Sequence, residues 1–423
     1  MKRTWPGWVV ITICSIIPLA LWLYYPLNST SALVNSGKAL GIVGYVLFAI
    51  NILLASRHPL LEKLFFSLGE VYGIHKLLGT ISLALLIYHP LLLATQYFTL
   101  GTPLAAAYFL PSLANWARTL GTFALVLMEA VLIATLFVKL GYKLWKRLHM
   151  YLGLAFVIAY IHIMFVPGDI ANDPLLKLYL LAIGAASIAG LIYRVANRRW
   201  ITPRAFYQLT AITPLSKSIT QLTLTPTEQP LRYTAGQFAF VSFQENGVIG
   251  ESHPYSITST PDQSALTFVI KGLGDDSRRA ATLPVNTIAL LEGGFGGFSF
   301  TTVPVKQQVW IAGGIGITPF IGLAHSLPAD HSATLYYSIS DDDDAVLLNE
   351  LHALESTNFT VVVWNSRKQG RLTAQHIAEH LPKGTDYGVL LCGPVPMQTA
   401  LADGFAQLGV PREQIYKEDF SLL

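Results

Sequence analysis

Cysteine is scarce in this sequence, with only two residues among 423. Cys14 lies in an apolar stretch near the start, and Cys392 lies far downstream. A small secreted domain that depends on disulfides carries an even set of closely spaced cysteines. The sequence therefore predicts no disulfide framework.

Charged residues are also scarce. Asp, Glu, Lys and Arg make up 13% of the chain, whereas hydrophobic residues make up 52%. The mean hydropathy of +0.47 is too high for a wholly water-soluble protein. The net charge is only +3, and no basic stretch is interleaved with aromatic residues, which predicts that nucleic acid is not a partner. The length allows two or three domains.

Long apolar runs are confined to the part of the chain before residue 200. Six of them reach the length of a transmembrane helix. They lie at residues 8–25, 38–56, 72–95, 117–138, 147–166 and 175–195. The first run is longer than the apolar core of a signal peptide and is not followed by a small-residue cleavage site, so we expect it to be the first membrane helix.

Basic residues gather at one set of helix ends. They precede the first run, separate the second from the third and the fourth from the fifth, and follow the sixth. Because cytoplasmic loops are enriched in Lys and Arg, this pattern predicts a multi-pass protein of the cell (inner) membrane with both termini in the cytoplasm. The basic residues are Lys2, Arg3, Arg57, Lys63, Lys139, Lys143, Lys146, Arg147, Arg194, Arg198, Arg199 and Arg204.

Two of the apolar runs each contain a pair of histidines, His75 and His89 in the third and His149 and His162 in the fifth. Fourteen helical steps bring His89 back to within about 40° of His75 and roughly 20 Å along the axis. The similar spacing in the fifth run predicts two His–His pairs stacked at two membrane depths. Imidazole binds iron well, and helix bundles often build metal sites from facing helices, so we expect a haem in each pair. The alternative is that these are hydrogen-bonded histidines of the bundle interior.

The predicted orientation places His75 with His149 near the cytoplasm, as the inner pair, and His89 with His162 near the outer face, as the outer pair. Lys38 and Arg118 lie at outer helix ends. They would hold haem propionates, attract an anionic acceptor, or simply extend toward the membrane surface. Four glycines would make room for a flat macrocycle or serve ordinary helix packing. They are Gly41, Gly44, Gly79 and Gly153.

The pattern changes to short strands after residue 200. Runs at 206–212, 218–224, 237–243, 266–271 and 287–291 predict a small antiparallel β-barrel. It contains the motif His253-Pro254-Tyr255-Ser256, in which an aromatic and a hydroxyl residue on an extended strand suit a planar ring. The glycine-rich turn from Lys271 to Ser277 opens a helix, and its backbone N–H groups suit a pyrophosphate.

A third pattern begins near residue 305. The strand 309–312 leads into Gly313-Gly314-Ile315-Gly316-Ile317-Thr318-Pro319 and an apolar helix, an arrangement typical of a nucleotide phosphate site. Strands at 333–339, 359–364 and 387–392 alternate with helices near 345–355, 373–381 and 395–408, which predicts a doubly wound parallel sheet. Cys392-Gly393-Pro394 ends one strand, so Cys392 is either near a nicotinamide or simply a buried small residue.

Together these motifs resemble one family. The spacings H-x13-H and H-x12-H on membrane helices, followed by HPYS, KGLGDDS, GGIGITP and LCGP, are similar to the NADPH oxidase and ferric reductase superfamily. The resemblance is to bacterial NADPH oxidase-like membrane flavocytochromes b that carry a ferredoxin–NADP reductase-like module. It implies a six-helix transmembrane di-haem domain at residues 1–200, an FAD-binding β-barrel at 201–304 and an NAD(P)H-binding α/β domain at 305–423.

The resemblance also implies roles for individual residues. His75, His89, His149 and His162 would ligate two b-type haems. His253, Pro254, Tyr255, Ser256 and Thr258 would contact the FAD ring, and Lys271, Gly272 and Ser277 would contact its ribityl and pyrophosphate part. Gly313, Gly314, Gly316, Thr318 and Pro319 would line the NAD(P)H pyrophosphate site, with Cys392, Gly393 and Pro394 near the nicotinamide. Phe420, in Glu418-Asp419-Phe420, would cover the flavin and share a catalytic role with Cys392.

The chain departs from NADPH-dependent members at one point. These usually carry a basic residue after the second strand of the nucleotide domain, where this chain has Ser338-Ile339-Ser340-Asp341. Arg367, Lys368 or Arg371 could replace it, and we expect NADPH, with NADH as the alternative. The sequence shows neither a calcium-binding extension nor a long outer loop, so we expect no calcium control and no obligatory protein partner.

The implied function is electron transfer across a lipid bilayer, from cytosolic NAD(P)H through FAD and two haems to an acceptor on the outer face. We expect O2 as the acceptor, giving superoxide. One alternative is a chelated Fe(III) or other metal, and another is a haem-flavin reductase component that serves a partner protein. A different class of alternative is a non-enzymatic membrane protein built on intramembrane histidines, which would leave the flavin and nucleotide motifs without a role.

Overall fold

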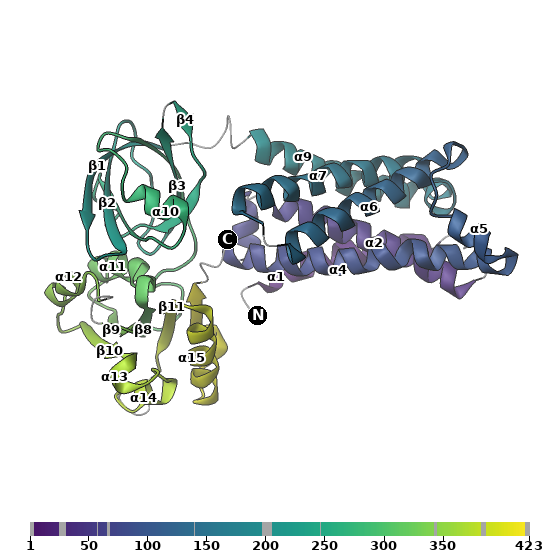
Figure 1. Ribbon diagram of the computed structural model, residues 1–423. Helices are drawn as coiled ribbons and strands as arrows, with labels where there is room; N and C mark the ends of the chain where they lie inside the picture. The colour runs from purple at the N-terminus through teal and green to yellow at the C-terminus, as the bar shows by residue number, and fades with distance from the viewer. Residues whose placement is uncertain are drawn as a thin grey trace. The chain divides into compact units, whose positions relative to one another are not determined.

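A computed structural model of the chain describes residues 4–24, 31–56, 58–65, 68–138, 140–196, 205–245, 247–341, 345–381 and 386–418. The chain forms two compact units, a helical unit, Arg3–Ile201, and a sheet unit, Thr202–Leu423. Figure 1 shows the helices of the first and the strands of the second.

The described part of the helical unit contains six helices that are long and apolar enough to cross a membrane. This confirms the predicted number, and each lies at its predicted apolar run. They are α1 (Trp5–Tyr24), α2 (Ala32–Leu54), α4 (Leu68–Ala94), α6 (Trp116–Phe137), α7 (Tyr142–Phe165) and α9 (Pro174–Ala196). Short helices connect them, namely α3 (Pro59–Phe65), α5 (Thr102–Ala107) and α8 (Asp169–Asn172).

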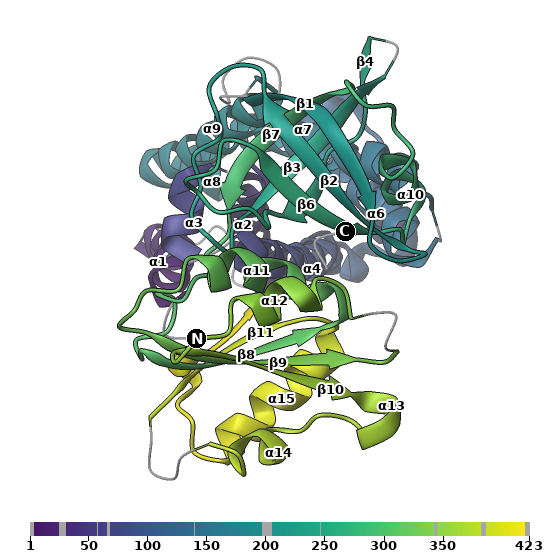
Figure 2. The ribbon, with the colours of Figure 1, turned by 90° about the vertical axis from the view of Figure 1, so that its left-hand side faces the viewer.

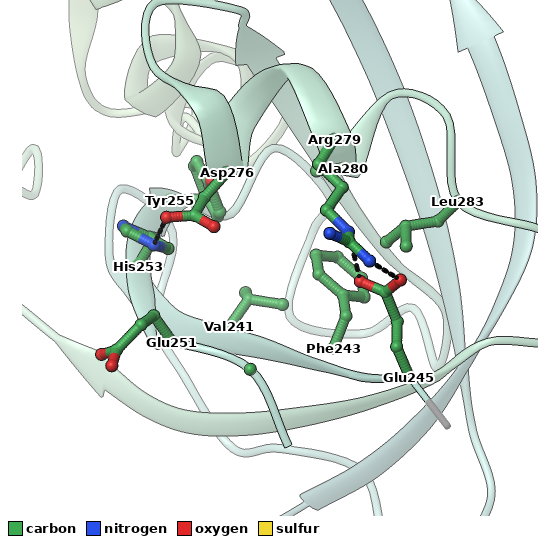
Figure 3. Close-up of a pocket in the computed structure, with 11 residues that line it drawn as sticks. Val241, Phe243, Glu245, Glu251, His253, Tyr255, Asp276, Arg279, Ala280 and Leu283 are labelled. Carbon is green, nitrogen blue, oxygen red and sulfur yellow. Dashed lines mark hydrogen bonds and ion pairs between the residues drawn. The ribbon is translucent and has the colours of Figure 1, made fainter. Parts of the chain in front are cut away.

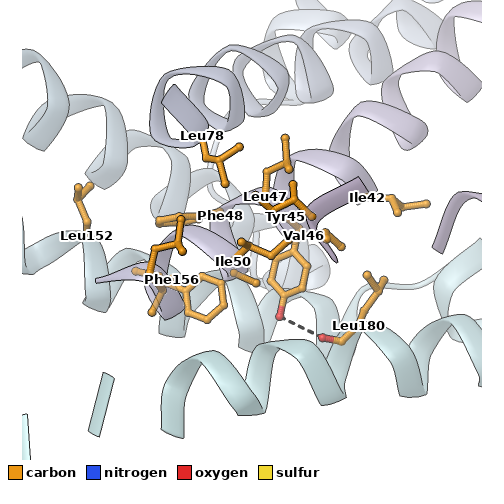
Figure 4. Packing of buried hydrophobic residues seen from close by; sticks show 14 of the residues in the cluster. Ile42, Tyr45, Val46, Leu47, Phe48, Ile50, Leu78, Leu152, Phe156 and Leu180 are labelled. Atoms are coloured by element: carbon orange, nitrogen blue, oxygen red, sulfur yellow. Dashed lines mark hydrogen bonds between the residues drawn. The ribbon is translucent and has the colours of Figure 1, made fainter. Parts of the chain in front are cut away.

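Helix α2 forms the centre of the helical unit. It is 72% buried over its apolar span, whereas the other five spans are at most 22% buried. A helix that is apolar on all sides is typical of such a position. Near the middle of α2, Tyr45 stacks on Phe156 of α7 at 5.7 Å between ring centroids, and Phe48 meets the same ring edge-on at 5.2 Å. Figure 4 shows this packing, with the Tyr45 hydroxyl directed at the carbonyl of Leu180 on α9.

The first part of the sheet unit is an antiparallel barrel, as predicted. Its strands are β1 (Ala205–Pro214), β2 (Ile219–Pro226), β3 (Phe238–Glu245), β4 (Val248–Ile249), β5 (His253–Ser256), β6 (Leu266–Lys271) and β7 (Ile288–Phe295). The hydrogen-bonded order is β4-β3-β7-β1-β2-β6, with β5 on β3. A bridge between Ile257, just after β5, and Phe268 of β6 closes the ring. The short helix α10 (Asp275–Ala280) follows β6.

The second part is a five-stranded parallel sheet. Its strands are β8 (Gln307–Gly313), β9 (Ser332–Ile339), β10 (Phe359–Asn365), β11 (Gly388–Cys392) and β12 (Ile415–Glu418), in the order β10-β9-β8-β11-β12. Both faces carry helices, and Figure 2 shows α11 (Thr318–His325) and α12 (Leu348–Ala353) on one face and α13 (Ser366–Gln369), α14 (Ala374–Ala378) and α15 (Val395–Gln407) on the other. This is the predicted doubly wound fold, with β12 as a strand that the sequence analysis missed.

The strand order reverses between β8 and β11, which is where doubly wound sheets bind ligands. Helix α11 starts from this point and approaches the barrel. A Cβ added at Gly322 would lie 3.3 Å from the carbonyl oxygen of Ser259 and 3.4 Å from that of Ile257. Glycine therefore lets α11 pack directly on the strand segment that follows the HPYS motif.

Candidate functional site

The first candidate site consists of the histidines that α4 and α7 present to each other. His75 of α4 and His149 of α7, the predicted inner pair, have ring centroids 6.1 Å apart and ring planes inclined by 59°. His89 and His162, the predicted outer pair, come from the same two helices. The structure thus brings the rings of the inner pair together between α4 and α7 and places both outer histidines on these helices.

Three of the four imidazoles form a hydrogen bond to a main-chain carbonyl of a neighbouring helix. The Nδ1 atom of His75 lies 3.1 Å from the oxygen of Asn51, and that of His89 lies 2.8 Å from the oxygen of Gly37, both on α2. The Nδ1 atom of His162 lies 2.7 Å from the oxygen of Ala117 on α6. A carbonyl oxygen can only accept, so each Nδ1 carries the hydrogen. The lone pair is then on Nε2, the tautomer that metal-ligating histidines with this support adopt.

His149 differs from the other three. Its Nδ1 atom is buried and has no hydrogen-bond partner among the residues that the structure describes. Its ring instead stacks on Trp145, one turn earlier on α7, at 5.0 Å and 16°. Thirteen residues on a regular helix leave His149 about 140° around the axis from His162, so the two rings of α7 face different neighbours.

The 6.1 Å between the inner rings fits a metal ion between them. A metal–nitrogen bond of about 2 Å on each side, and roughly 1 Å from nitrogen to ring centre, gives about 6 Å. Within the described ranges, no three His, Cys, Asp or Glu residues cluster in a way that could hold a metal. The chain thus offers two imidazoles at each level, and a metal there would need its remaining ligands from elsewhere, as a planar cofactor supplies them.

Two glycines make room for the rings of the outer pair. A Cβ added at Gly41 of α2 would lie 2.5 Å from Nδ1 of His89, and one added at Gly121 of α6 would lie 2.9 Å from Nδ1 of His162. Gly121 was not predicted, although it lies one turn after Ala117. Each of these glycines thus follows, by one turn, the residue whose carbonyl accepts from the same ring.

The other glycines proposed to face a macrocycle contact side chains instead. A Cβ at Gly44 would meet Leu86, one at Gly79 would meet Asn51, and one at Gly153 would meet Leu191, each at about the limit of contact or closer. These neighbours belong to packed helices, so the structure favours the packing alternative at all three positions.

The two cations predicted to lie at outer helix ends have different environments. The Lys38 ammonium lies 2.8 Å from the carboxylate of Asp169 on α8, which also accepts from the indole N–H of Trp22 at 2.9 Å. Lys38 therefore takes part in a largely buried ion pair rather than extending freely. The Arg118 guanidinium lies over the ring of Tyr108 at 4.9 Å, and its Nε atom is buried without a partner among the described residues.

The second candidate site is a pocket on the barrel, between strands β3 and β5 and helix α10 (Figure 3). His253 and Tyr255 of the HPYS motif line it, whereas Pro254 and Ser256 do not, because alternate residues of a strand face opposite sides. The other lining residues are Val241, Phe243, Glu245, Gly250, Glu251, Asp276, Arg279, Ala280 and Leu283.

Two polar contacts join residues of this pocket. His253 Nε2 lies 3.2 Å from Oδ2 of Asp276, and the Arg279 guanidinium binds the Glu245 carboxylate through both of its oxygens. The hydrogen bonds from Arg279 hold the pKa of Glu245 below its usual range. Burial, and then the charge of Asp276, raise the pKa of Tyr255 to about 12, so this phenol keeps its proton at neutral pH.

Other residues predicted to contact FAD serve the barrel itself. The Thr258 hydroxyl is buried against that of Thr267 at 2.7 Å. The Ser277 hydroxyl accepts from the N–H of Gly274 at 2.9 Å and lies 3.0 Å from its carbonyl oxygen, which fixes the start of α10. Gly272 donates its N–H to Ser218 at 2.8 Å. Lys271 ends β6 and, like Gly272 and Ser277, does not line the pocket.

The third candidate site is the glycine turn after β8, where it meets the turn after β11. A Cβ at Gly316 would lie 2.4 Å from the carbonyl oxygen of Cys392, and one at Gly313 would lie 2.9 Å from Pro394. Gly314 has φ +52° and a Cβ there would project into open space. These glycines let the two turns pack together while the main chain at Gly314 stays open to a ligand.

The remaining residues of this site are mostly buried. Gly313, Gly316, Thr318 and Pro319 are buried, and Thr318 donates its hydroxyl to the carbonyl of Ile315 at 3.1 Å. Cys392 is fully buried at the end of β11, whereas Gly393 is half-buried and Pro394 exposed. Phe420 lies outside the described residues.

Several residues of these sites were not predicted. Gly121, Asp169, Asp276 and Arg279 gain their roles only when distant segments meet. Trp145 stacks on His149 one turn away on the same helix. The nearest sequence signal was the DDSRR run of α10, whose charges follow a glycine turn. In the sequence, Asp169 is one of the few charged residues between the fifth and sixth apolar runs.

Sequence profiles of three families match consecutive parts of the chain. Residues 40–160 match the ferric reductase like transmembrane component, residues 206–293 match an FAD-binding domain, and residues 310–403 match the oxidoreductase NAD-binding domain. The first match includes His75, His89 and His149 and ends two residues before His162. The other two cover most of the barrel and of the parallel sheet, in the order that the structure shows.

Individual proteins are similar to parts of the chain. The ferredoxin reductase component of the 3-ketosteroid-9-alpha-monooxygenase of Mycobacterium tuberculosis is 29% identical over 206 residues, which are 46% of this chain and 56% of that relative. This chain thus spans little more than half the length of that relative. The NADH-cytochrome b5 reductase 1 of Cryptococcus neoformans is 30% identical over 202 residues, 42% of this chain and 68% of that protein.

Among solved structures, a flavohemoglobin of Malassezia yamatoensis with bound FAD and haem aligns with a TM-score of 0.50. The alignment covers 78% of this chain and 94% of that one, at 17% identity, which is a likeness of fold alone. The three family matches are more specific. With a membrane component of the ferric reductase type followed by FAD-binding and NAD-binding domains, the chain is an oxidoreductase that belongs to the NADPH oxidase and ferric reductase superfamily.

Proposed function

We propose that this protein transfers electrons from cytosolic NAD(P)H, through FAD and two b-type haems, to an acceptor on the outer face of the cell membrane. The observation that carries the proposal is the pairing of imidazoles between α4 and α7, three of them with Nδ1 bonded to a main-chain carbonyl. When bound, FAD would supply the chemistry that accepts two electrons as a hydride and passes them on one at a time, as haem iron requires.

The haem-binding role is assigned to four residues. His75 and His149 would ligate the inner haem, and His89 and His162 the outer one. The carbonyls of Asn51, Gly37 and Ala117 orient three of the rings and keep Nε2 unprotonated. Intramembrane polar side chains with a fixed tautomer are typical of functional sites rather than of packing.

The FAD and nucleotide roles go to the sheet unit. We assign FAD to the pocket of His253 and Tyr255, with Pro254, Ser256 and Thr258 shaping the strand and with Lys271, Gly272 and Ser277 shaping the turn before α10. Nucleotide pyrophosphate is assigned to Gly313, Gly314, Gly316, Thr318 and Pro319, and nicotinamide to the turn of Cys392, Gly393 and Pro394. The open main chain at Gly314, at the switch point of the sheet, supports this assignment. Phe420 is kept as the residue that covers the flavin.

We propose the domain bounds 1–200, 201–304 and 305–423, and a topology with both termini in the cytoplasm. The division of the chain near residue 201 and the basic residues at alternate helix ends support both assignments. The sheet unit would then lie on the side where NAD(P)H is available.

We propose O2 as the acceptor, with superoxide as the product, because an outer haem can pass its electron to a small acceptor without a dedicated binding surface. A chelated Fe(III) is the second candidate, and the match to a ferric reductase like component favours it. A separate protein acceptor is the third, in line with the relatives named as components of larger enzyme systems.

Turnover by the purified full chain in lipid vesicles separates these candidates. With NAD(P)H supplied on the side of the sheet unit, the proposal predicts oxygen uptake and reduction of cytochrome c on the opposite side of the bilayer. Superoxide dismutase on that side should suppress the reduction. Rapid reduction of Fe(III)-citrate with little superoxide would support the metal reductase. Negligible turnover with both, in protein that reduces ferricyanide, would indicate a protein acceptor. Protein without flavin or haem would contradict the whole proposal.

A further inference from the structure

Asp341 occupies the position in the nucleotide domain that meets the adenosine ribose in doubly wound folds. It follows the end of β9, the strand that pairs in parallel with β8 on the side away from β11. The dinucleotide is expected across the carboxyl ends of these strands, with its ribose near the end of the second strand. An acidic residue there accepts hydrogen bonds from the ribose hydroxyls of NADH, whereas NADPH requires a basic one.

The Asp341 side chain is bound by the nearest arginine. Nη1 of Arg367 lies 2.6 Å from Oδ2 of Asp341, with 70% and 49% of the two side chains exposed. Arg367 is one of the three basic residues that the sequence offered as replacements for the missing NADPH-binding residue. In the structure its charge is directed at Asp341.

Two hydrogen bonds between side chains and the main chain fix the segment that carries Arg367. Arg367 lies in the first turn of α13, where its N–H donates to the side chain of Asn365 at 3.0 Å, and Ser366 donates its hydroxyl to the carbonyl of Ile339 at 2.9 Å. The turn after β10 is thereby fixed to the end of β9, and Arg367 is kept on the side of Asp341.

We infer that this protein uses NADH in preference to NADPH, with Asp341 as the residue that determines the preference. The carboxylate accepts from the ribose 2′-hydroxyl and repels a 2′-phosphate, and Arg367 serves as its counterion rather than as a phosphate ligand. This replaces the expectation of NADPH drawn from the sequence, and it deepens the proposed function, on which it rests.

The test compares the two nucleotides as electron donors for the purified full chain with ferricyanide as acceptor. We expect kcat/KM for NADH to exceed kcat/KM for NADPH by about tenfold or more. D341N should lower this NADH-to-NADPH ratio by at least about tenfold, or reverse the preference. Asp330→Asn is the matched control. Asp330 also forms an exposed ion pair at 2.6 Å, with Lys306, but it lies before the amino end of β9, whereas Asp341 follows the carboxyl end. Loss of the Asp330 carboxylate should therefore leave the NADH-to-NADPH ratio unchanged.

Binding of AMP and 2′-AMP, measured by calorimetry on the same preparations, separates this inference from the proposed function. If the wild type binds AMP more tightly than 2′-AMP and D341N abolishes this difference, the role of Asp341 is supported, even if the protein transfers no electrons. The absence of electron transfer would overturn only the proposed function. If the wild type instead prefers NADPH and 2′-AMP, and R367Q loses this preference, the inference is overturned and the proposed function stands. An unchanged ratio in D341N would also overturn it.

Discussion

The Nδ1 atom of His162 lies 2.7 Å from the carbonyl oxygen of Ala117, and the residue one turn later, Gly121, gives the ring its space. The same relationship holds for His89, which bonds to Gly37 and packs on Gly41. The same two contacts thus hold His89 between α2 and α4 and His162 between α6 and α7. A carbonyl sets the tautomer, and a glycine one turn on lets the helix approach the ring.

This arrangement predicts the effect of adding a single methyl group. In Gly121→Ala, the new Cβ would lie 2.9 Å from Nδ1 of His162, too close for the ring to keep its position. We expect the variant to lose the outer haem while the inner one stays, so that haem content falls by about half. Haem quantitation by the pyridine haemochrome method measures this directly.

Gly73→Ala is the control for that experiment. Gly73 lies on α4, the helix of His75 and His89, and a Cβ there would meet nothing within 4 Å. Its haem content should equal that of the wild type. Full haem content in Gly121→Ala would show that the glycine is not needed to seat the ring.

Removal of an inner ligand should separate the two halves of the electron path. In His149→Ala we expect loss of the inner haem and of turnover with outer acceptors, while NAD(P)H still reduces the flavin in anaerobic stopped-flow experiments. His58→Ala is the control. His58 accepts from the N–H of Leu60 at 3.3 Å in the loop before α3, so its loss should leave both haems in place. Retention of both haems in His149→Ala would refute the assigned pairing.

The ion pair between Lys38 and Asp169 should contribute to the stability of the helical unit. Only 23% and 10% of these side chains are exposed, so Asp169→Asn leaves a poorly solvated ammonium without its counter-charge. We expect a loss of about 2 kcal/mol and a lower melting temperature by roughly 5 °C, with haem content retained.

The exposed pair Lys306–Asp330 provides the comparison for that measurement. Both side chains are more than half exposed, so Asp330→Asn should cost no more than about 1 kcal/mol. Light scattering or intrinsic fluorescence measures the melting temperatures. If Asp169→Asn and the wild type melt at the same temperature, the buried pair adds nothing to stability.

Tyr255 should act in the barrel pocket through its ring and not through its proton. Burial, and then Asp276, raise the pKa of its phenol to about 12, so the group stays protonated over the range from about pH 6 to 9. Tyr255→Phe should therefore leave the rate of flavin reduction and its pH profile unchanged, whereas Tyr255→Ala should bind FAD at least about tenfold more weakly. A pH profile altered by Tyr255→Phe would assign a proton-transfer role to the phenol.

Much of the fold was predictable because each signal is local. An apolar run of about 20 residues can be satisfied in a membrane only as a helix, and all six such runs became helices. The glycine turn before α11 and the HPYS strand were also found where the sequence placed them. Residues 415–418, by contrast, form a four-residue segment that ends in Lys417 and Glu418, which is too short and too polar to predict β12.

The details of the sites depend on contacts between distant segments and could not be predicted. His89 bonds to a carbonyl 52 residues away, and His162 to one 45 residues away. A carbonyl acceptor has no residue signature, because every residue carries one. The ion pair of Asp341 with Arg367 likewise forms only once β9 and β10 lie side by side.

Haem quantitation combined with a reduced-minus-oxidised spectrum of the purified full chain is the most direct test of the central claim. The account predicts two b-type haems per chain, both low-spin, as expected of iron held between two imidazoles. A chain purified with its flavin that contains no haem, or whose haem spectrum persists after all four histidines are replaced, would contradict it.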